Sequence, residues 1–163
     1  SEVPVRQVQN TLLDAGGYLL PYLDLPREHE FFKILQRIGS TGIMKGTGFS
    51  KGWSNQTFFR INDLTLGSDL EGIREIWPLT EYDFSDTVIT VQQTVDLIRL
   101  TARQNGIAIN EEDLAEALSG ISDNRPEWME RPILRIEAAI LIDQALDPFN
   151  NVKVTLKGAY LNP

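Results

Sequence analysis

The sequence contains no cysteine, and His29 is the only histidine among its 163 residues. Without cysteine the chain can form no disulfide, thiolate zinc site, iron–sulfur cluster or cysteine nucleophile. A single histidine cannot build a histidine-rich metal site. Because His29 stands between Glu28 and Glu30 at a predicted helix start, a capping or packing role is favoured over catalysis. The lack of cysteine leaves the compartment open.

The sequence is also poor in basic charge and in long apolar runs. It has 15 Lys and Arg against 23 Asp and Glu, a formal net charge of −8, with no long basic run. Binding to nucleic acid requires clustered Lys and Arg, so we expect no nucleic-acid partner. Anionic membrane surfaces are disfavoured for the same reason. No apolar run approaches the roughly 20 residues of a membrane-spanning helix, so we expect no membrane insertion.

Helical periodicity runs through most of the chain. Apolar residues recur every three or four positions, which predicts helices near residues 5–12, 31–38, 91–102, 114–121 and 135–146. Val152, Val154 and Leu156 alternate with polar residues, which predicts a short strand. The fold class is therefore mainly α. We expect residues 1–163 to form a single compact helical domain with a short C-terminal β segment.

The stretch Gly42–Trp53, GIMKGTGFSKGW, holds four glycines, which predicts a turn-rich connection. Within it, residues 45–50 carry two of the three glycines of a dinucleotide-binding turn. No buried strand is predicted before them, and such a turn needs one. We therefore favour a tight turn there and expect no cofactor in this chain.

Three predicted helix starts share one pattern. Thr90 and Gln93 form a capping box, in which each side chain satisfies a backbone N–H at the opposite end of the turn. Leu64–Thr65 opens a similar segment, with Ser68 and Glu71 as a further possible box. At the third start Leu134 holds the cap position and has no side-chain oxygen. Losing a cap typically costs about 1 kcal/mol, so another group should anchor that turn. The three starts indicate a degenerate internal repeat.

These residues resemble the S-layer homology repeat. The resemblance covers one nearly complete repeat, about residues 22–77, and repeat halves at about 88–105 and 110–147. The matching positions are Tyr22, Asp24, Pro26, His29, Phe31, Ile34, Ile38, the turn 41–46, Phe58 or Phe59, and the Leu64–Thr65, Ile89–Thr90 and 133–139 helix starts. It implies helix-loop-helix units throughout the chain.

A narrower resemblance is to the C-terminal region of bacterial FAD-dependent oxidoreductases. It is carried by residues 36–43, 52–59 and 135–149. In that family the flavin domain lies upstream. The resemblance implies that this chain is the C-terminal, non-flavin fragment of a larger enzyme, with the upstream domain as its partner and FAD bound there.

Arg135 and Glu137 are the first candidates for ligand contact. In cell-wall-binding members of the S-layer homology family the matching arginine contacts an acidic glycan, and a guanidinium suits carboxylate oxygens. The corresponding positions at the other helix starts are Val91 and Leu66, which cannot hold an anion. The favoured alternative is that Arg135 and Glu137 make first-turn contacts within the domain.

The second candidate site is the segment around Trp53, Asn55, Gln56 and Phe58. Aromatic faces and amides can grip sugar rings, and the same residues could hold this loop against an upstream domain. For Asp143, inside the apolar helix, an exposed edge is favoured, and the alternative is a pair with a buried arginine.

The favoured function is a non-catalytic helical accessory or interaction domain, since no nucleophile with its base can be identified. The alternative is a module that binds carbohydrate or cell-wall polymer, with an acidic or neutral glycan as its ligand. That alternative favours the periplasm or cell surface.

Overall fold

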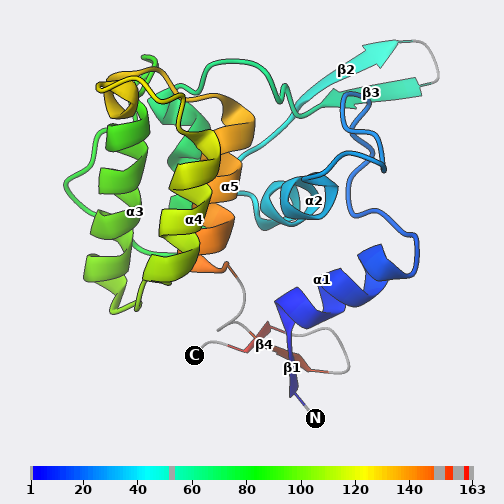
Figure 1. Ribbon diagram of the computed structural model, residues 1–163. Coiled ribbons are helices and arrows are strands. Elements are labelled where there is room, and N and C mark those ends of the chain that lie inside the picture. Colours follow the sequence, from blue (N-terminus) through cyan, green and yellow to red (C-terminus); the bar gives the residue numbers. More distant parts are fainter. Residues whose placement is uncertain (1, 52–53, 149–152, 156–159, 162–163) are drawn as a thin grey trace.

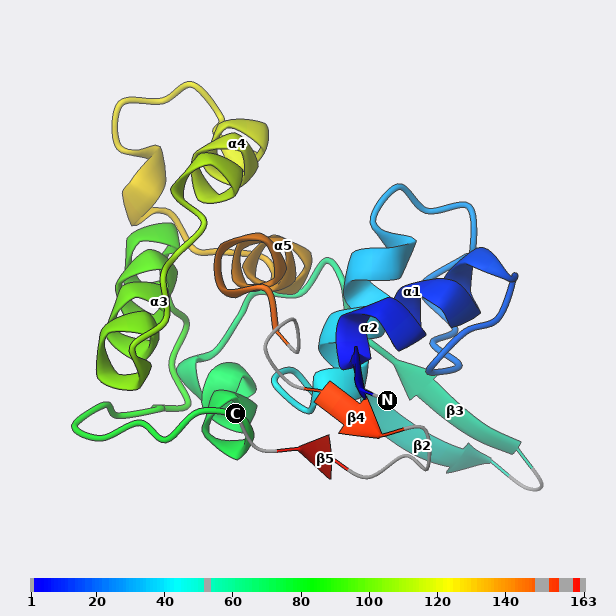
Figure 2. The ribbon, with the colours of Figure 1, turned by 90° about the horizontal axis from the view of Figure 1, so that it is seen from below.

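The computed structural model describes residues 2–51, 54–148, 153–155 and 160–161. Its elements, in chain order, are β1 (Glu2–Pro4), α1 (Val5–Asp14), α2 (Phe32–Thr41), β2 (Thr47–Lys51), β3 (Ser54–Phe58), the 3-10 helix η1 (Gly67–Glu75), α3 (Val91–Asn105), α4 (Glu111–Ile121), the 3-10 turn η2 (Trp128–Glu130), α5 (Arg135–Leu146), β4 (Lys153–Thr155) and β5 (Tyr160–Leu161). The protein is mainly helical, as the periodicity predicts. Helix α5 lies at the centre, with α3 and α4 on one side and α1 and α2 on the other (Figure 2).

The helix ends follow the local sequence closely. Helix α2 ends at Gly42, whose φ of 82° lies in the left-handed region that glycine adopts without strain. Just before α2, the Nδ1 atom of His29 accepts a hydrogen bond from the Phe31 N–H, which is a capping role. Helix α3 begins with the predicted box of Thr90 and Gln93. Helix α4 begins at Asn110, whose side chain accepts from the N–H of Asp113.

Helix α5 is apolar on nearly every face. Ala138, Leu141, Ile142 and Ala145 are all almost completely buried. A helix that is hydrophobic all round belongs in a protein interior, and the central position of α5 agrees with that rule. A strip of α5 that remains partly uncovered is therefore informative.

The three helix starts that look alike in sequence meet in a closed ring of backbone hydrogen bonds. The Thr65 N–H donates to Ile133 O (2.8 Å), the Ile133 N–H to Ile89 O (3.1 Å), and the Ile89 N–H to Thr65 O (3.0 Å). A second set of bonds joins the residue two positions after one ring member to the residue two positions before another. The N–H groups of Gly67, Val91 and Arg135 donate to the carbonyls of Thr87, Arg131 and Asp63, respectively. Each segment bonds to the other two in the same way, so the three are structurally equivalent.

The ring also fixes which side chains face the core. Thr65, Ile89 and Ile133 are buried. Their neighbours in the chain pair across the ring, as Leu64 with Leu134, Leu66 with Val88, and Thr90 with Pro132. Because side chains alternate along an extended segment and paired residues share a face, these six project to the opposite, outer side. Leu64 and Val88 are among the exposed large apolar residues.

A carboxylate or amide caps each start at the equivalent position. The side chains of Asp69, Gln93 and Glu137 accept from the backbone N–H three residues before them, which belong to Leu66, Thr90 and Leu134 respectively. This corrects two expectations. The box at the first start uses Asp69 rather than Ser68 or Glu71. In the ring Thr65 is equivalent to Ile133, so the position equivalent to Arg135 is Gly67. The sequence comparison placed it one residue earlier, at Leu66.

The stretch 42–53 is not simply a turn-rich connection. Its second part, β2, pairs antiparallel with β3, for example Thr47 with Phe58, and the hairpin projects from the helices (Figure 1). The carboxylate of Asp24 accepts from the N–H groups of Phe59, Arg60 and Ile61 and so holds the base of the hairpin. The prediction failed because glycines spaced two to four apart favour turns locally, whereas a strand needs a partner to define it.

A small sheet joins the two ends of the described chain. Strand β4 pairs antiparallel with β1 and with β5. The predicted C-terminal strand is confirmed at residues 153–155, while Val152 and Leu156 lie outside the described residues. Residues 2–4 form β1, and α1 follows directly at Val5.

Candidate partner-binding site

Arg135 is buried within the fold, with a relative exposure of 0%. Its Nε donates to Phe59 O and its Nη2 to Lys45 O, both at 2.9 Å, and Nη1 lies 3.0 Å from Oδ1 of Asp69 as an ion pair. Burial is the main cause that lowers the pKa of the guanidinium, and the Asp69 charge opposes it. The side chain fastens the hairpin to α5. It has no surface that a glycan could touch.

Glu137 is also engaged inside the domain. Its carboxylate accepts the Leu134 N–H at 2.9 Å and pairs with the guanidinium of Arg131, with Oε2 2.6 Å from Nη2. The hydrogen bond to Glu137 is the main cause that raises the pKa of Arg131. Glu137 is thus the anchor that the missing cap at Leu134 requires. The sequence pattern did not single out Arg131 as its partner, because six residues separate the two and no helical spacing connects them.

The other candidate residues belong to the hairpin. Asn55 and Gln56 lie in β3, opposite Ser50 and Phe49. Phe58 is half-buried at the base of β3, next to the Phe59 carbonyl that Arg135 binds. Trp53 lies outside the described residues. The structure therefore brings Arg135 and Phe58 to the same end of the hairpin, and places Glu137 apart, beside Arg131.

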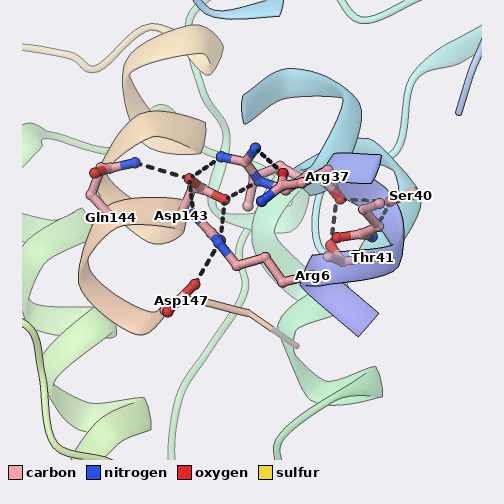
Figure 3. A network of polar contacts seen from close by, with 10 residues as sticks. Arg6, Arg37, Ser40, Thr41, Asp143, Gln144 and Asp147 are labelled. Atoms are coloured by element: carbon pink, nitrogen blue, oxygen red, sulfur yellow. Dashed lines mark hydrogen bonds and ion pairs between the residues drawn. The ribbon is translucent and has the colours of Figure 1, made fainter. Parts of the chain in front are cut away.

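Asp143 is buried, with 1% exposure, and two arginines hold it (Figure 3). Arg37 from α2 donates through Nε (3.3 Å) and Nη2 (2.9 Å), and Arg6 from α1 through Nη1 (3.0 Å) and Nη2 (3.2 Å). Arg6 also lies 2.7 Å from Asp147, a carboxyl whose pKa burial raises. The favoured interpretation, that Asp143 lies on an exposed edge, is therefore wrong, and the alternative pair with a buried arginine is correct. The network joins α1, α2 and α5.

An apolar groove runs along a face of α5 that the described residues cover only in part. Its volume is about 570 Å³. Ile136, Ile140 and Gln144, spaced four residues apart on one face of α5, lie along it. Its walls are Phe31 and Ile34 at the start of α2, Ala117, Gly120 and Ile121 of α4, and Leu134 of the ring. The sequence pattern assigned most of these residues to helix faces but could not show that this strip stays uncovered.

The charges around this groove, here called the α5 groove, are of one sign. Asp113, Glu116 and Glu137 line it, and none of the described residues that line it is Lys or Arg. Helix α4 itself carries four carboxylates and no basic residue. Because Arg131 neutralises Glu137, the negative potential is concentrated beside Asp113 and Glu116.

A second, more polar pocket of about 400 Å³ lies between the end of α2 and η1. Ser68, Asp69 and Arg74 line it, together with the ion pair of Lys45 and Glu75 at 2.8 Å. Among the described residues no group of three or more His, Cys, Asp or Glu side chains converges as a metal site would. Within the same part of the chain, no helix has the length and apolar character needed to cross a membrane.

Comparison of the chain with models of known protein families, with curated proteins and with solved structures finds no match. Function is therefore inferred from the geometry of the described residues.

Proposed function

We propose that this chain is a non-catalytic interaction domain that receives an apolar segment of a partner in the α5 groove. The observation that carries the proposal is the incomplete cover of α5. The apolar surface of a central helix should be buried, yet Ile136 is only partly buried in the groove that it lines together with the buried Ile140 and the partly exposed Gln144. Burying such a strip stabilises a complex through the hydrophobic effect.

The polar groups that could have suggested catalysis already have structural partners. Asp143, Arg135 and Glu137 are each bound to other residues of the domain. His29 caps a helix start. These assignments favour binding over chemistry.

We infer further that the partner is an upstream domain of a longer protein, in line with the resemblance to the C-terminal region of FAD-dependent oxidoreductases. The hairpin and the α5 groove would then be the surfaces that face that domain. Stoichiometric binding of FAD by residues 1–163 alone would contradict this assignment, because the flavin belongs to the upstream domain.

The absence of cysteine from the sequence permits a direct test. Ala117→Cys places a single thiol in the wall of the groove, and Glu112→Cys places one on the exposed part of the same helix, outside the groove. Maleimide labelling at the introduced cysteine, located by peptide mass, is compared between residues 1–163 and the longer protein that the full reading frame encodes. We expect the longer protein to label more slowly at position 117 and equally at 112. If the two proteins label at the same rate at position 117 as well as at position 112, the upstream domain does not occupy the groove.

Glycan binding is a second candidate function, favoured only by the polar pocket beside η1. Its hydroxyl, carboxylate and guanidinium groups can hydrogen-bond to sugar hydroxyls. A glycan array with the wild-type chain and with Arg74→Ala tests it. Glycan binding that is lost in Arg74→Ala would support this function, and an array without signal would exclude it.

A further inference from the structure

The α5 groove has the shape of a site for a helix rather than for a strand. The strip of α5 that lines it, from Ile136 to Gln144, covers nine residues, or about 12 Å along the helix axis. Its walls and floor come mostly from α2, α4 and α5, whose backbone groups are largely paired within each helix. A bound segment would find no free sheet edge here and would have to satisfy its own backbone hydrogen bonds, as a helix does.

The groove has a defined direction. Helix α4 runs antiparallel to α5, because the Asn110 N–H donates to Ala145 O while Arg131, just before α5, donates to Ile121 O. Asp113 and Glu116, near the start of α4, therefore lie towards the Gln144 end. At the opposite end the lining carboxylate is Glu137, which is paired with Arg131. That end opens at Leu134, which is paired across the ring with the exposed Leu64.

From this arrangement we propose that the α5 groove binds an amphipathic helix that carries Lys or Arg. Apolar side chains of that helix, spaced three or four residues apart, would cover Ile136 and Ile140. Its basic residues would face Asp113 and Glu116. The inference rests on the proposed function and adds the chemistry of the partner to it.

Charge decides between this occupant and two others. A second copy of the chain also carries a net charge of −8, and an acidic α4 would meet an acidic surface. An anionic membrane would be repelled by the same carboxylates. A cationic helix instead gains from both the apolar strip and the acidic rim, as complementary charges across an interface favour association.

The probe is a fluorescent amphipathic peptide of about 18 residues, long enough to place two turns on the strip. One version has Leu on its apolar face and Lys on its polar face. A matched version has Glu in place of every Lys, and a third carries a central proline that prevents a helix. Fluorescence anisotropy measures the binding of each peptide to residues 1–163, at low and at physiological salt.

We expect the Lys peptide to bind with micromolar affinity, and the Glu and proline peptides to bind at least about tenfold more weakly. Ala117→Arg, which blocks the groove, should weaken the Lys peptide by at least about tenfold. Glu116→Lys should weaken it by about two- to fivefold, as expected for a rim charge. Glu112→Lys, on the same helix outside the groove, should leave it unchanged. Circular dichroism checks that each variant is folded.

Three results would overturn the inference. Lys and Glu peptides that bind equally would show that charge does not select the partner. Ala117→Arg without effect would place binding elsewhere. No binding of the Lys peptide, together with protection of position 117 in the longer protein, would refute the basic helix and leave the interaction function intact.

Discussion

Nη2 of Arg37 lies 2.9 Å from Oδ2 of Asp143, and both side chains are buried where α2 crosses α5. The two residues are 106 positions apart in the sequence. Their pairing makes the orientation of α2 against α5 depend on one carboxylate, which Arg6 shares.

The first prediction follows from that dependence. Asp143→Asn removes the charge that compensates two guanidinium groups, of which Arg37 is buried. Breaking a buried ion pair from one side typically costs about 3–5 kcal/mol, and we expect the free energy of unfolding to fall by that amount. Urea denaturation measures it. Asp86→Asn, at an exposed acid, is the control and should change stability by less than about 0.5 kcal/mol. Equal effects of the two substitutions would show that the network contributes nothing particular.

The second prediction concerns Arg135. Arg135→Lys keeps the charge but cannot reach the carbonyls of Phe59 and Lys45 together, because an ammonium lacks the planar fork of the guanidinium. We expect a loss of about 2–3 kcal/mol in the free energy of unfolding, since buried acceptors lose their donors. Arg103→Lys, on the exposed part of α3, serves as the matched control. If Arg135→Lys lowered the free energy of unfolding no more than the control does, the Arg135 side chain would not be what holds the hairpin against α5.

The third prediction compares two glycines. A Cβ at Gly72 would lie 1.8 Å from Gly42 O and 2.8 Å from Ile43 O, because η1 packs directly on that turn. We expect Gly72→Ala to destabilise the protein by about 2–3 kcal/mol through forced displacement of the backbone. At Gly120 nothing lies within 4 Å of an added Cβ. Since Gly120 is helical, Gly120→Ala should stabilise the protein by about 0.5 kcal/mol. Thermal unfolding with both variants tests the contrast, and similar shifts in the same direction would contradict it.

The fourth prediction concerns alkaline pH. Tyr22 is buried against Gly39 and Phe59, and burial is the main cause that raises its pKa to about 12. Because the pKa in the folded state exceeds the ordinary value of 10.0, the folded state holds the proton longer. The stabilising contribution is complete below pH 10 and is lost as the pH rises from 10 to 12.

Urea midpoints at several values between pH 9 and 11.5 test this dependence. The wild-type protein should lose stability with a slope of up to about 1.4 kcal/mol per pH unit from this group. Tyr22→Phe should be flatter over the same range. Tyr18→Phe, at a tyrosine that is 57% exposed, should follow the wild-type curve. A Tyr22→Phe curve as steep as the wild type would show that Tyr22 does not titrate in this window.

Much of the local structure could be predicted from the residues. The capping box of Thr90 with Gln93 and the cap of the Leu134 N–H by Glu137 each join residues three positions apart, so local sequence is enough to suggest them. The similarity of the three helix starts was also visible. What the sequence could not show was that they bond to one another in a ring, because the three segments are separated by long intervals and the bonds join backbone atoms.

The hairpin and Asp143 show the limits of local pattern. Strand β2 contains Gly48 and follows Gly46, so its extended form depends on pairing with β3 and on the grip of Asp24 at its base. In a helix that is apolar on most of its faces, the spacing of apolar residues does not indicate whether a single aspartate is buried or exposed. Only the approach of Arg6 and Arg37 from distant parts of the chain decides that Asp143 is buried.

The sequence by itself determined the helices, most of their caps and the acidic character of α4, since each depends on residues within a few positions of one another. Only the tertiary structure decided that Arg135 is buried between the hairpin and α5, and that Ile136 and Gln144 stay partly exposed along a groove. The physical reason is that burial is a relation between surfaces. An apolar face predicts that something covers it, and only the packed fold shows which faces the chain covers itself.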